Sequence, residues 1–353
     1  MTDLDKPQLF RETDPHDMLA RISELPQQCR DAWANAQSLE LPGGYRQAEA
    51  VVILGMGGSA IGGDLLRTLV ESECPVPIVV SRDYTVPAFV NGRTLAIASS
   101  YSGDTEETLA ALEAARQAGA MLLAIATGGK LAARARELNA PLLTFDYRAQ
   151  PRAALGHSIV ALISIVCQLG LVSDKAADLD EAISAMESWQ REINETVPLA
   201  ENAAKKLAVK LHEHLSVVYG AGHLSEVARR WKGQFNENAK SWAFFEQLPE
   251  MNHNALAGTE FPADLAEKIV AVMLTSPLDH PRTTVRFQIT QEIFSQRGVS
   301  CEMVEARGSS RLAQMLSAIH FGDYVSFYLA MLYGVDPTSL KVVDYLKQRL
   351  AEI

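Results

Sequence analysis

Residues 50–63 read AVVILGMGGSAIGG, and this stretch decides the fold class. Its first five residues form a short run rich in β-branched side chains, and a glycine follows directly, which is typical of a strand buried on both faces. The glycines predict a tight turn, and we expect a helix from about Ile61 to Glu71. A strand, a glycine-rich turn and a helix in this order form the repeating unit of a parallel sheet with helical crossovers.

More units of this kind follow along the chain. We expect further strands at 78–80, 94–98, 121–126 and 141–145, with helices at 105–118 and 131–138 between them. Short connections between alternating strands and helices predict a doubly wound parallel sheet. Apolar residues at helical spacing predict a leading helix or helix pair at 16–38, and helices dominate again from 152 to about 209.

A second α/β series starts with the strand Leu215–Gly220. Its other expected elements are strands at 268–274 and 299–304 and helices at about 222–240, 284–297, 310–333 and 337–351. Two segments of the first series have counterparts in the second, in the same order: 51–57 with 216–222, and 95–100 with 270–276. We interpret this as a diverged internal repeat, although any two turns from strand to helix look alike. The predicted domains are an N-terminal helical segment (1–45), an α/β domain (46–150), a helical linker (151–209) and a second α/β domain with the C-terminal helix (210–353).

Composition narrows the functional classes. The chain has 353 residues, of which 48% are hydrophobic and 21% charged, so it can bury a large core. Its formal net charge of -11 disfavours a protein that binds nucleic acid through the phosphate backbone. The four cysteines are far apart, which indicates neither a disulfide framework nor a zinc site. With no signal-peptide pattern and no run of about 18 apolar residues, a soluble cytoplasmic protein without membrane partners is expected.

The turn after the first strand, Gly55–Gly63, has the composition of an anion-binding loop at a helix N-terminus. Taken alone it also fits a dinucleotide-binding turn. The loop 99–108, SSYSGDTEET, favours a compact phosphate, because it places several hydroxyls at the start of the next helix. A simple helix cap would need only one such residue. We therefore predict a phosphate site formed by Gly57, Gly58, Ser59, Ser100, Ser102 and Thr105, with Asp104 and Glu106 pointing away from the anion.

The second series lacks both phosphate-binding motifs. Its first turn is Gly220-Ala-Gly-His, without the Gly-Gly-Ser sequence, and Ser276-Pro-Leu-Asp stands in place of the hydroxyl loop. We therefore expect one phosphate site per chain, with the second domain supplying another part of the function.

These motifs resemble those of sugar isomerase (SIS) domains. The segments 236–240 (NENAK) and 249–254 (PEMNHN) make the chain similar to the bifunctional phosphoglucose/phosphomannose isomerases, from about residue 15 to the C-terminus. The segment EMNHN discriminates best, because sugar-phosphate regulators also contain SIS domains. The resemblance implies an α/β fold of two SIS-type (flavodoxin-like) doubly wound parallel-sheet domains related as a diverged repeat, with helical N-terminal, linker and C-terminal segments.

The resemblance also implies a set of site residues. Aldose–ketose isomerisation moves a proton between C1 and C2 through a cis-enediolate, and it needs no redox cofactor and no metal. Glu237 resembles the family's base, and His253 its ring-opening acid/base. Arg152 matches the family's arginine, which would stabilise the enediolate. Lys347 is the expected lysine near the ring oxygen, with Lys341 as the weaker candidate.

Each of these roles has a competing interpretation. Glu246 and Glu250 are nearby alternatives to Glu237 as the base. Arg152 could pair with Asp146 at the surface, and Lys347 could be an ordinary exposed helical lysine. His253 could simply be a capping or core residue.

The family resemblance further implies a homodimer in which His253 completes the neighbouring subunit's site. The expected substrates are glucose 6-phosphate, fructose 6-phosphate and mannose 6-phosphate; use of both aldoses would involve a small hydroxyl residue, Thr338 or Ser339. A non-catalytic sugar-phosphate sensor and a nucleotide-dependent dehydrogenase are the alternative functions. A metal site at His212-Glu213-His214 is disfavoured, because a spacing of two residues suits no single helical face and no third ligand is in view.

Overall fold

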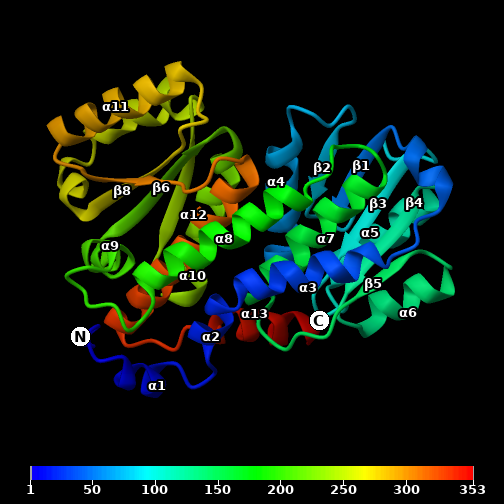
Figure 1. Ribbon diagram of the computed structural model, residues 1–353, viewed down its shortest axis with the longest axis horizontal. Coiled ribbons are helices and arrows are strands. Elements are labelled where there is room, and N and C mark those ends of the chain that lie inside the picture. Colours follow the sequence, from blue (N-terminus) through cyan, green and yellow to red (C-terminus); the bar gives the residue numbers. More distant parts are fainter. Residues whose placement is uncertain (1, 353) are drawn as a thin grey trace. The chain divides into compact units, whose positions relative to one another are not determined.

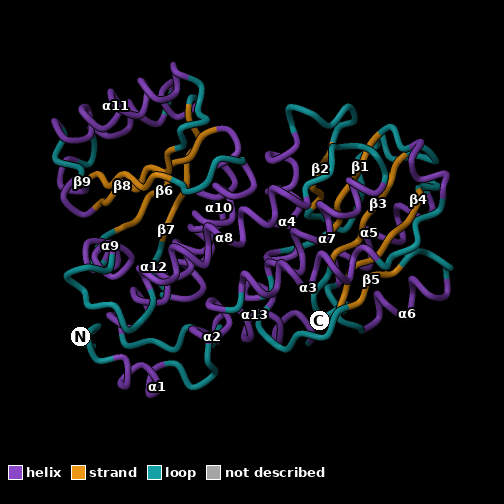
Figure 2. Tube along the Cα trace, in the orientation of Figure 1, coloured by secondary structure: helices purple, strands orange, loops and turns teal. Residues whose placement is uncertain are grey.

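Each of the two strand series forms a parallel sheet of its own (Figures 1 and 2). The computed structural model describes residues 2–352, which divide into two units. The first unit contains Ser23–Ala185 and Gly308–Gln314. The second contains the chain up to Ile22, Met186–Arg307 and the chain from Met315 onward.

The sheet of the first unit has the strand order β2-β1-β3-β4-β5. Every neighbouring pair is parallel. The strands are β1 (Ala50–Leu54), β2 (Ile78–Ser81), β3 (Thr94–Ser99), β4 (Met121–Ala126) and β5 (Leu142–Thr144). All residues of β1 and β3 are buried, as the apolar sequence of both strands predicts.

Helices cover both faces of this sheet. They are α3 (Leu25–Gln37), α4 (Gly57–Val70), α5 (Glu106–Gln117), α6 (Gly129–Glu137), α7 (Leu155–Gln168) and the start of α8 (Ala176–Ile193). Ile53 of β1 contacts Gly63 of α4, whereas the neighbouring residues Val52 and Leu54 share a core cluster with residues of α5 and α6. Successive strand residues therefore face opposite helical layers, which confirms the predicted doubly wound sheet.

The sheet of the second unit has the strand order β7-β6-β8-β9 and is also parallel. Its strands are β6 (Leu215–Ala221), β7 (Ala243–Leu248), β8 (Ile269–Thr275) and β9 (Ser300–Glu305). This order matches β2-β1-β3-β4 of the first sheet, in agreement with the predicted repeat. Sequence analysis missed β7, because its AFFEQL sequence lacks regular alternation and ends in two polar residues before Leu248.

The helices of the second unit are α1 (Phe10–Thr13), α2 (Met18–Ser23), α9 (Ala203–Leu211), α10 (Ser225–Asn238), α11 (Pro281–Gln296), most of α12 (Arg311–Tyr333) and α13 (Lys341–Ala351). Phe287 and Phe294 of α11 cover one sheet face, where they pack with Tyr219 and Met273. By length and composition α12 could cross a membrane, but its apolar stretch is completely buried inside the protein. A central core helix has the same properties.

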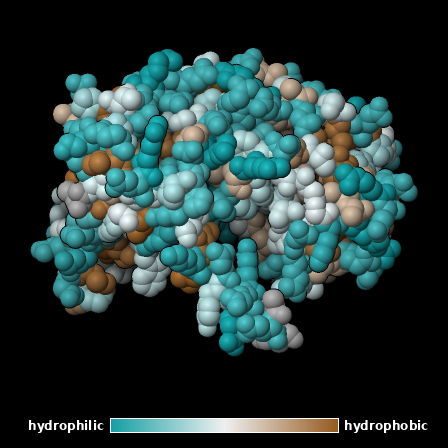
Figure 3. Space-filling view, turned by 90° about the horizontal axis from the view of Figure 1, so that it is seen from below, coloured by the Kyte–Doolittle hydropathy of each residue, from teal (hydrophilic) through white to brown (hydrophobic). Residues whose placement is uncertain are grey.

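Short 3-10 helices connect many of these elements: η1 (Pro7–Leu9), η2 (Gly43–Gln47), η3 (Pro151–Ala153), η4 (Gly222–Leu224), η5 (Glu250–His253), η6 (Ala255–Glu260) and η7 (Ala263–Lys268). Two helices begin at other residues than the sequence predicts. α4 begins at Gly57, because the glycines of the turn already form its first residues, and α13 begins only at Lys341. The face of the protein in Figure 3 is mostly hydrophilic, with scattered hydrophobic side chains.

Candidate functional site

The two predicted phosphate-binding turns meet at one edge of the first sheet. Leu54 and Ala98, near the ends of β1 and β3, are direct partners in the parallel register, so the segments that follow them lie side by side. At Gly55 a Cβ atom would come within 2.7 Å of the carbonyl oxygen of Ser99. Only glycine permits this close approach of the two turns.

Hydrogen bonds that involve serine and threonine hydroxyls hold this edge together. The Ser100 and Thr105 hydroxyls are 2.9 Å apart, and the Ser100 oxygen also accepts the Gly103 N–H at 3.1 Å. Ser59, at the start of α4, accepts the Tyr101 N–H at 3.1 Å. These bonds tie Ser59, Ser100 and Thr105 to one loop, which also contains Ser102, and Gly57 and Gly58 directly precede Ser59. We call the six predicted residues, Gly57–Ser59, Ser100, Ser102 and Thr105, the phosphate cradle. That these six residues bind a phosphate stays a prediction.

Both helices that point into the cradle start without a side-chain cap among the described residues. Thr105 precedes α5 and Met56 precedes α4, and neither side chain accepts a hydrogen bond from the first turn of its helix. The hydroxyl of Thr105 therefore bonds to Ser100 rather than capping α5. Open amides and the positive ends of two helix dipoles favour an anion at this position.

Asp104 does not compete with an anion in the cradle. One of its carboxylate oxygens accepts the Lys130 N–H at 3.1 Å, at the start of α6. The carboxylate therefore points toward another helix N-terminus, as the predicted phosphate site requires. The Asp104 N–H in turn donates to the Ser102 hydroxyl at 3.2 Å.

Arg152 belongs to the short helix η3, which packs directly against the start of α4. A Cβ atom on Gly58 would lie 3.0 Å from the carbonyl group of Pro151 and 3.1 Å from the nitrogen of Arg152. Arg152 is only 2% exposed, which does not fit the competing interpretation of a surface ion pair with Asp146. The first unit thus contains both the cradle and the predicted enediolate-stabilising arginine.

Tyr101 is a supporting residue that sequence analysis missed. Its hydroxyl donates to the carbonyl oxygen of Tyr147 and accepts the Ala149 N–H at 2.8 Å. The hydroxyl loop thereby holds the segment that leads into Arg152. No local pattern could reveal this contact, because the partners lie more than 40 residues apart.

In the second unit, Glu237 lies in the last turn of α10 and is half-buried. It lines a cavity of about 600 Å³ together with Asn236, Lys240, Val335, Asp336, Ser339, Leu340, Lys341, Val342 and Val343. The ammonium group of Lys240 donates to the carbonyl oxygens of Glu237 at 2.9 Å and Asn238 at 3.3 Å, and also to that of Asp336. This contact joins the end of α10 to the segment that precedes α13, and a cation at this helix end also suits the dipole.

The cavity distinguishes between several predicted residues. Lys341 and Ser339 line it with Glu237, whereas Lys347 lies farther along the exposed face of α13. Thr338 is half-buried beside the cavity, and its N–H donates to the Asp336 carboxylate at 2.8 Å. The alternative bases Glu246 and Glu250 are not lining residues.

His253 ends the short helix η5 and is exposed, which excludes a core role for it. Within residues 2–352 no group of three or more His, Cys, Asp or Glu side chains is arranged to hold a metal ion. The ring of His214 bonds through Nδ1 to the backbone carbonyl oxygen of His212, at 2.8 Å.

Comparison with known proteins identifies relatives that match most of the chain. Residues 200–350 match the family described as the bacterial phospho-glucose isomerase C-terminal SIS domain. A bifunctional phosphoglucose/phosphomannose isomerase of Caldicellulosiruptor bescii is 42% identical over 95% of this chain and 99% of its own length. One from Aquifex aeolicus is 35% identical over 86% of this chain and 90% of its own. The C-terminal domain of glucosamine-fructose-6-phosphate aminotransferase from Francisella tularensis has a similar fold: the TM-score is 0.74 at 15% identity, covering 91% of this chain and 98% of that one.

Proposed function

The chain belongs to the family of bifunctional phosphoglucose/phosphomannose isomerases, and we propose that it interconverts glucose 6-phosphate and mannose 6-phosphate with fructose 6-phosphate. The 42% identity to the Caldicellulosiruptor enzyme, over 95% of the chain, carries this proposal. The phosphate cradle of the first unit supports it independently, because all three sugars present the same phosphate monoester. Two helix N-termini and a set of hydroxyl donors suit such a dianion.

Glu237 is the proposed base. As a carboxylate it takes the proton from C2 of the aldose and returns it to C1, which yields the ketose through a cis-enediolate. Its half-buried position beside a cavity of about 600 Å³ supports this role, because such a cavity can hold the carbon chain of a hexose. Returning the proton to either face of C2 produces the two aldoses, and Ser339 or Thr338 is the hydroxyl proposed to permit this.

The remaining groups act on oxygen atoms. His253 exchanges protons with O5 and O1 when the ring opens, since a histidine can both donate and accept a proton near neutral pH. Arg152 stabilises the negative charge that develops on the enediolate oxygens. A lysine near the ring oxygen assists: Lys347 is the family match, whereas Lys341 has the support of lining the Glu237 cavity.

We propose that the enzyme works in the cytoplasm without a metal or cofactor. The reaction moves only protons, so it needs neither redox chemistry nor a Lewis acid. The four cysteines are all free, in keeping with a reducing compartment. Turnover that is unchanged after dialysis against EDTA would support metal independence, and loss of activity that Zn²⁺ or Mg²⁺ restores would contradict it.

A homodimer in which His253 acts in the neighbouring subunit's site is part of the proposal. The exposure of His253 supports it, because the side chain is accessible to a second chain. Mixing inactive Glu237→Gln and His253→Gln proteins tests this arrangement. Shared sites would restore up to about one quarter of wild-type activity, because half the dimers are mixed and each mixed dimer has one intact site. Sites formed within one chain would restore none.

The decisive experiment is a coupled assay with each of the three hexose 6-phosphates. We expect turnover in both directions between fructose 6-phosphate and each aldose phosphate. Tight binding without turnover would instead identify a sugar-phosphate sensor. Turnover of glucose 6-phosphate alone would remove only the phosphomannose activity from the proposal.

A further inference from the structure

The second sheet lacks a strand that the first sheet has. In the first unit, β5 pairs in parallel with the outer edge of β4. The counterpart of β4 is β9, and no strand among residues 2–352 pairs with its outer edge. In the first series a helix and β5 follow β4, whereas in the second series the chain passes from β9 directly to α12. The position of a fifth strand is therefore vacant.

Main-chain groups of β9 face this vacant position. The Ala306 N–H bonds to the Thr275 carbonyl oxygen of β8, at 2.9 Å. Because the peptide groups of a parallel strand alternate between its two sides, those of Met303 and Glu305 face outward. An unpaired edge of this kind can accept another extended segment.

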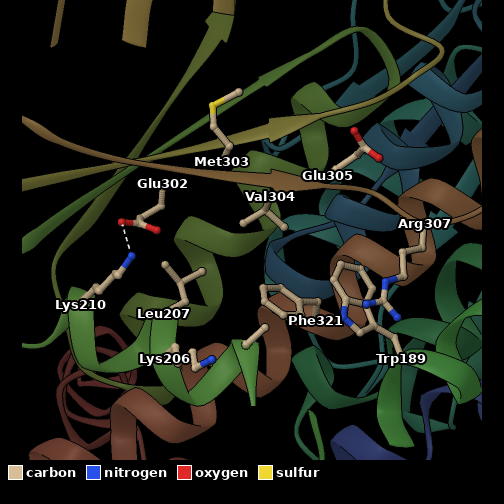
Figure 4. A pocket seen from close by; sticks show the side chains of 11 residues that line it. Trp189, Lys206, Leu207, Lys210, Glu302, Met303, Val304, Glu305, Arg307 and Phe321 are labelled. Atoms are coloured by element: carbon tan, nitrogen blue, oxygen red, sulfur yellow. Dashed lines mark hydrogen bonds and ion pairs between the residues drawn. The ribbon is translucent and has the colours of Figure 1, made fainter. Parts of the chain in front are cut away.

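A cavity of about 310 Å³ lies along the same edge, and all its lining residues belong to the second unit. Figure 4 shows that Glu302 and Val304 of β9 point toward α9 and Phe321, whereas Met303 and Glu305 point the other way. Four largely buried apolar side chains form the floor on the α9 side: Trp189, Leu207, Val304 and Phe321. The cavity therefore offers space for an apolar side chain next to the free main-chain groups.

On the side of the cavity that faces α9, one charge is left for an acidic partner; Glu305, which also lines the cavity, points to the other side. Lys210 is paired with Glu302 at 2.7 Å. The Arg307 guanidinium stacks on the Trp189 ring at 4.4 Å and is held by Glu192 at 2.6 and 2.8 Å. Lys206 is exposed, and among the described residues its ammonium group has no ion pair. Of the cations that line the cavity, Lys206 is thus the one open to an added carboxylate.

We propose that the outer edge of β9 is a docking site for a short extended segment of a partner protein, which adds as a fifth strand. The segment hydrogen-bonds to the peptide groups of Met303 and Glu305. On the side facing α9 it carries one apolar and one acidic residue, two positions apart, as side chains on one face of a strand must be. The apolar residue contacts Phe321 and Val304, and the acidic residue pairs with Lys206. The length of β5, three residues, indicates the minimum length of the segment.

A labelled peptide tests the main-chain part of the proposal. The probe is a fluorescein-labelled, end-blocked peptide, Thr-Val-Thr-Glu-Thr, titrated with the whole enzyme and followed by fluorescence anisotropy. Glu305→Pro removes an outward N–H that the ladder to β8 does not use, and proline is tolerated in that position of an edge strand. We expect the Kd of the peptide to rise about two- to tenfold, the loss expected for one main-chain hydrogen bond. The matched control Glu305→Ala keeps the N–H and should bind like the wild type. Unchanged isomerase activity shows that both variants are folded.

Reversing the charge at position 206 provides a second readout and leaves β9 unchanged. Lys206→Glu should weaken binding of the glutamate peptide about tenfold and bind the corresponding lysine peptide more tightly than the wild type does. The proposal is overturned if Glu305→Pro and Glu305→Ala bind the peptide equally well, or if the wild type shows no saturable binding. A change in oligomeric state caused by Glu305→Pro would also overturn it, since the edge would then hold a second copy of this chain.

Discussion

Two threonines, Thr105 directly before α5 and Thr108 within it, provide a matched test of the phosphate cradle. Thr105 lies half-buried in the cradle, where its hydroxyl bonds to that of Ser100 at 2.9 Å. Thr108 is three residues farther along and only 1% exposed, and its hydroxyl has no hydrogen-bond partner among the described residues. Replacing each by valine makes the same chemical change at nearly the same place in the fold. The two variants therefore separate a hydroxyl that we propose to contact the substrate from one that we do not.

The expected size of the effect follows from the kind of bond that is lost. A hydrogen bond to a charged group contributes about 1.5–3 kcal/mol. Because about 1.4 kcal/mol corresponds to a factor of ten, Thr105→Val should raise KM for fructose 6-phosphate about 10- to 150-fold. The phosphate is bound equally in the ground state and the transition state, so kcat should stay within about threefold of the wild type. Thr108→Val should leave KM unchanged and the protein equally or more stable, since it removes a buried polar group that has no partner.

Steady-state kinetics and thermal unfolding of both variants are the measurements. If Thr105→Val lowers the melting temperature and leaves KM unchanged, the Thr105 hydroxyl only holds the loop, and the phosphate binds elsewhere. A fall in kcat at constant KM would place Thr105 near the reacting carbons rather than near the phosphate. Equal effects of the two substitutions on KM would show that the loss is not specific to the cradle.

Three further predictions concern the base, a half-buried carboxyl group and a glycine. Glu237→Gln should lower kcat about 10²- to 10⁴-fold while sugar-phosphate affinity, measured by calorimetry, changes only a few-fold; substantial remaining turnover would mean that another group is the base. Burial raises the pKa of Asp279 to about 6, so the protonated carboxyl group contributes to stability below about pH 4, and this contribution is lost as the pH rises through 6. Asp279→Asn should remove this part of the dependence of the melting temperature on pH. An unchanged dependence in the variant would contradict the prediction. Gly103→Ala should lower the melting temperature more than Gly119→Ala. Both glycines have positive φ (75° and 79°), but only at Gly103 would a Cβ overlap a backbone carbonyl, that of Gly128; equal losses would refute this packing argument.

Most strands and helices could be predicted from the sequence, because each depends on residues that are close in the chain. The β-branched run of β1 and the glycines after it specify a buried strand and a tight turn by themselves. β7 was missed because its pairing with β6 stabilises it more than its own sequence pattern does. Predicted helix starts were off by about four residues at α4 and α13, where turn residues and loop residues are hard to assign locally.

The cradle residues were predictable because each lies within a few residues of a strand end, and neighbouring parallel strands end at one sheet edge. The surroundings of Glu237 were not. The cavity that it shares with Lys341 and Ser339 depends on how the segment after α12 returns to the end of α10, about 100 residues farther along the chain. No periodicity of either segment contains that information.

The sequence by itself determined the order of strands and helices, the repeat and the two glycine- and hydroxyl-rich turns, since short-range spacing and backbone preferences specify them. Only the tertiary structure decided that Tyr101 supports the segment before Arg152, that Lys341 rather than Lys347 lines the Glu237 cavity, and that β9 has a free edge. These properties come from packing between segments that are distant in the chain, where contact depends on the shape of the whole unit and not on any local pattern.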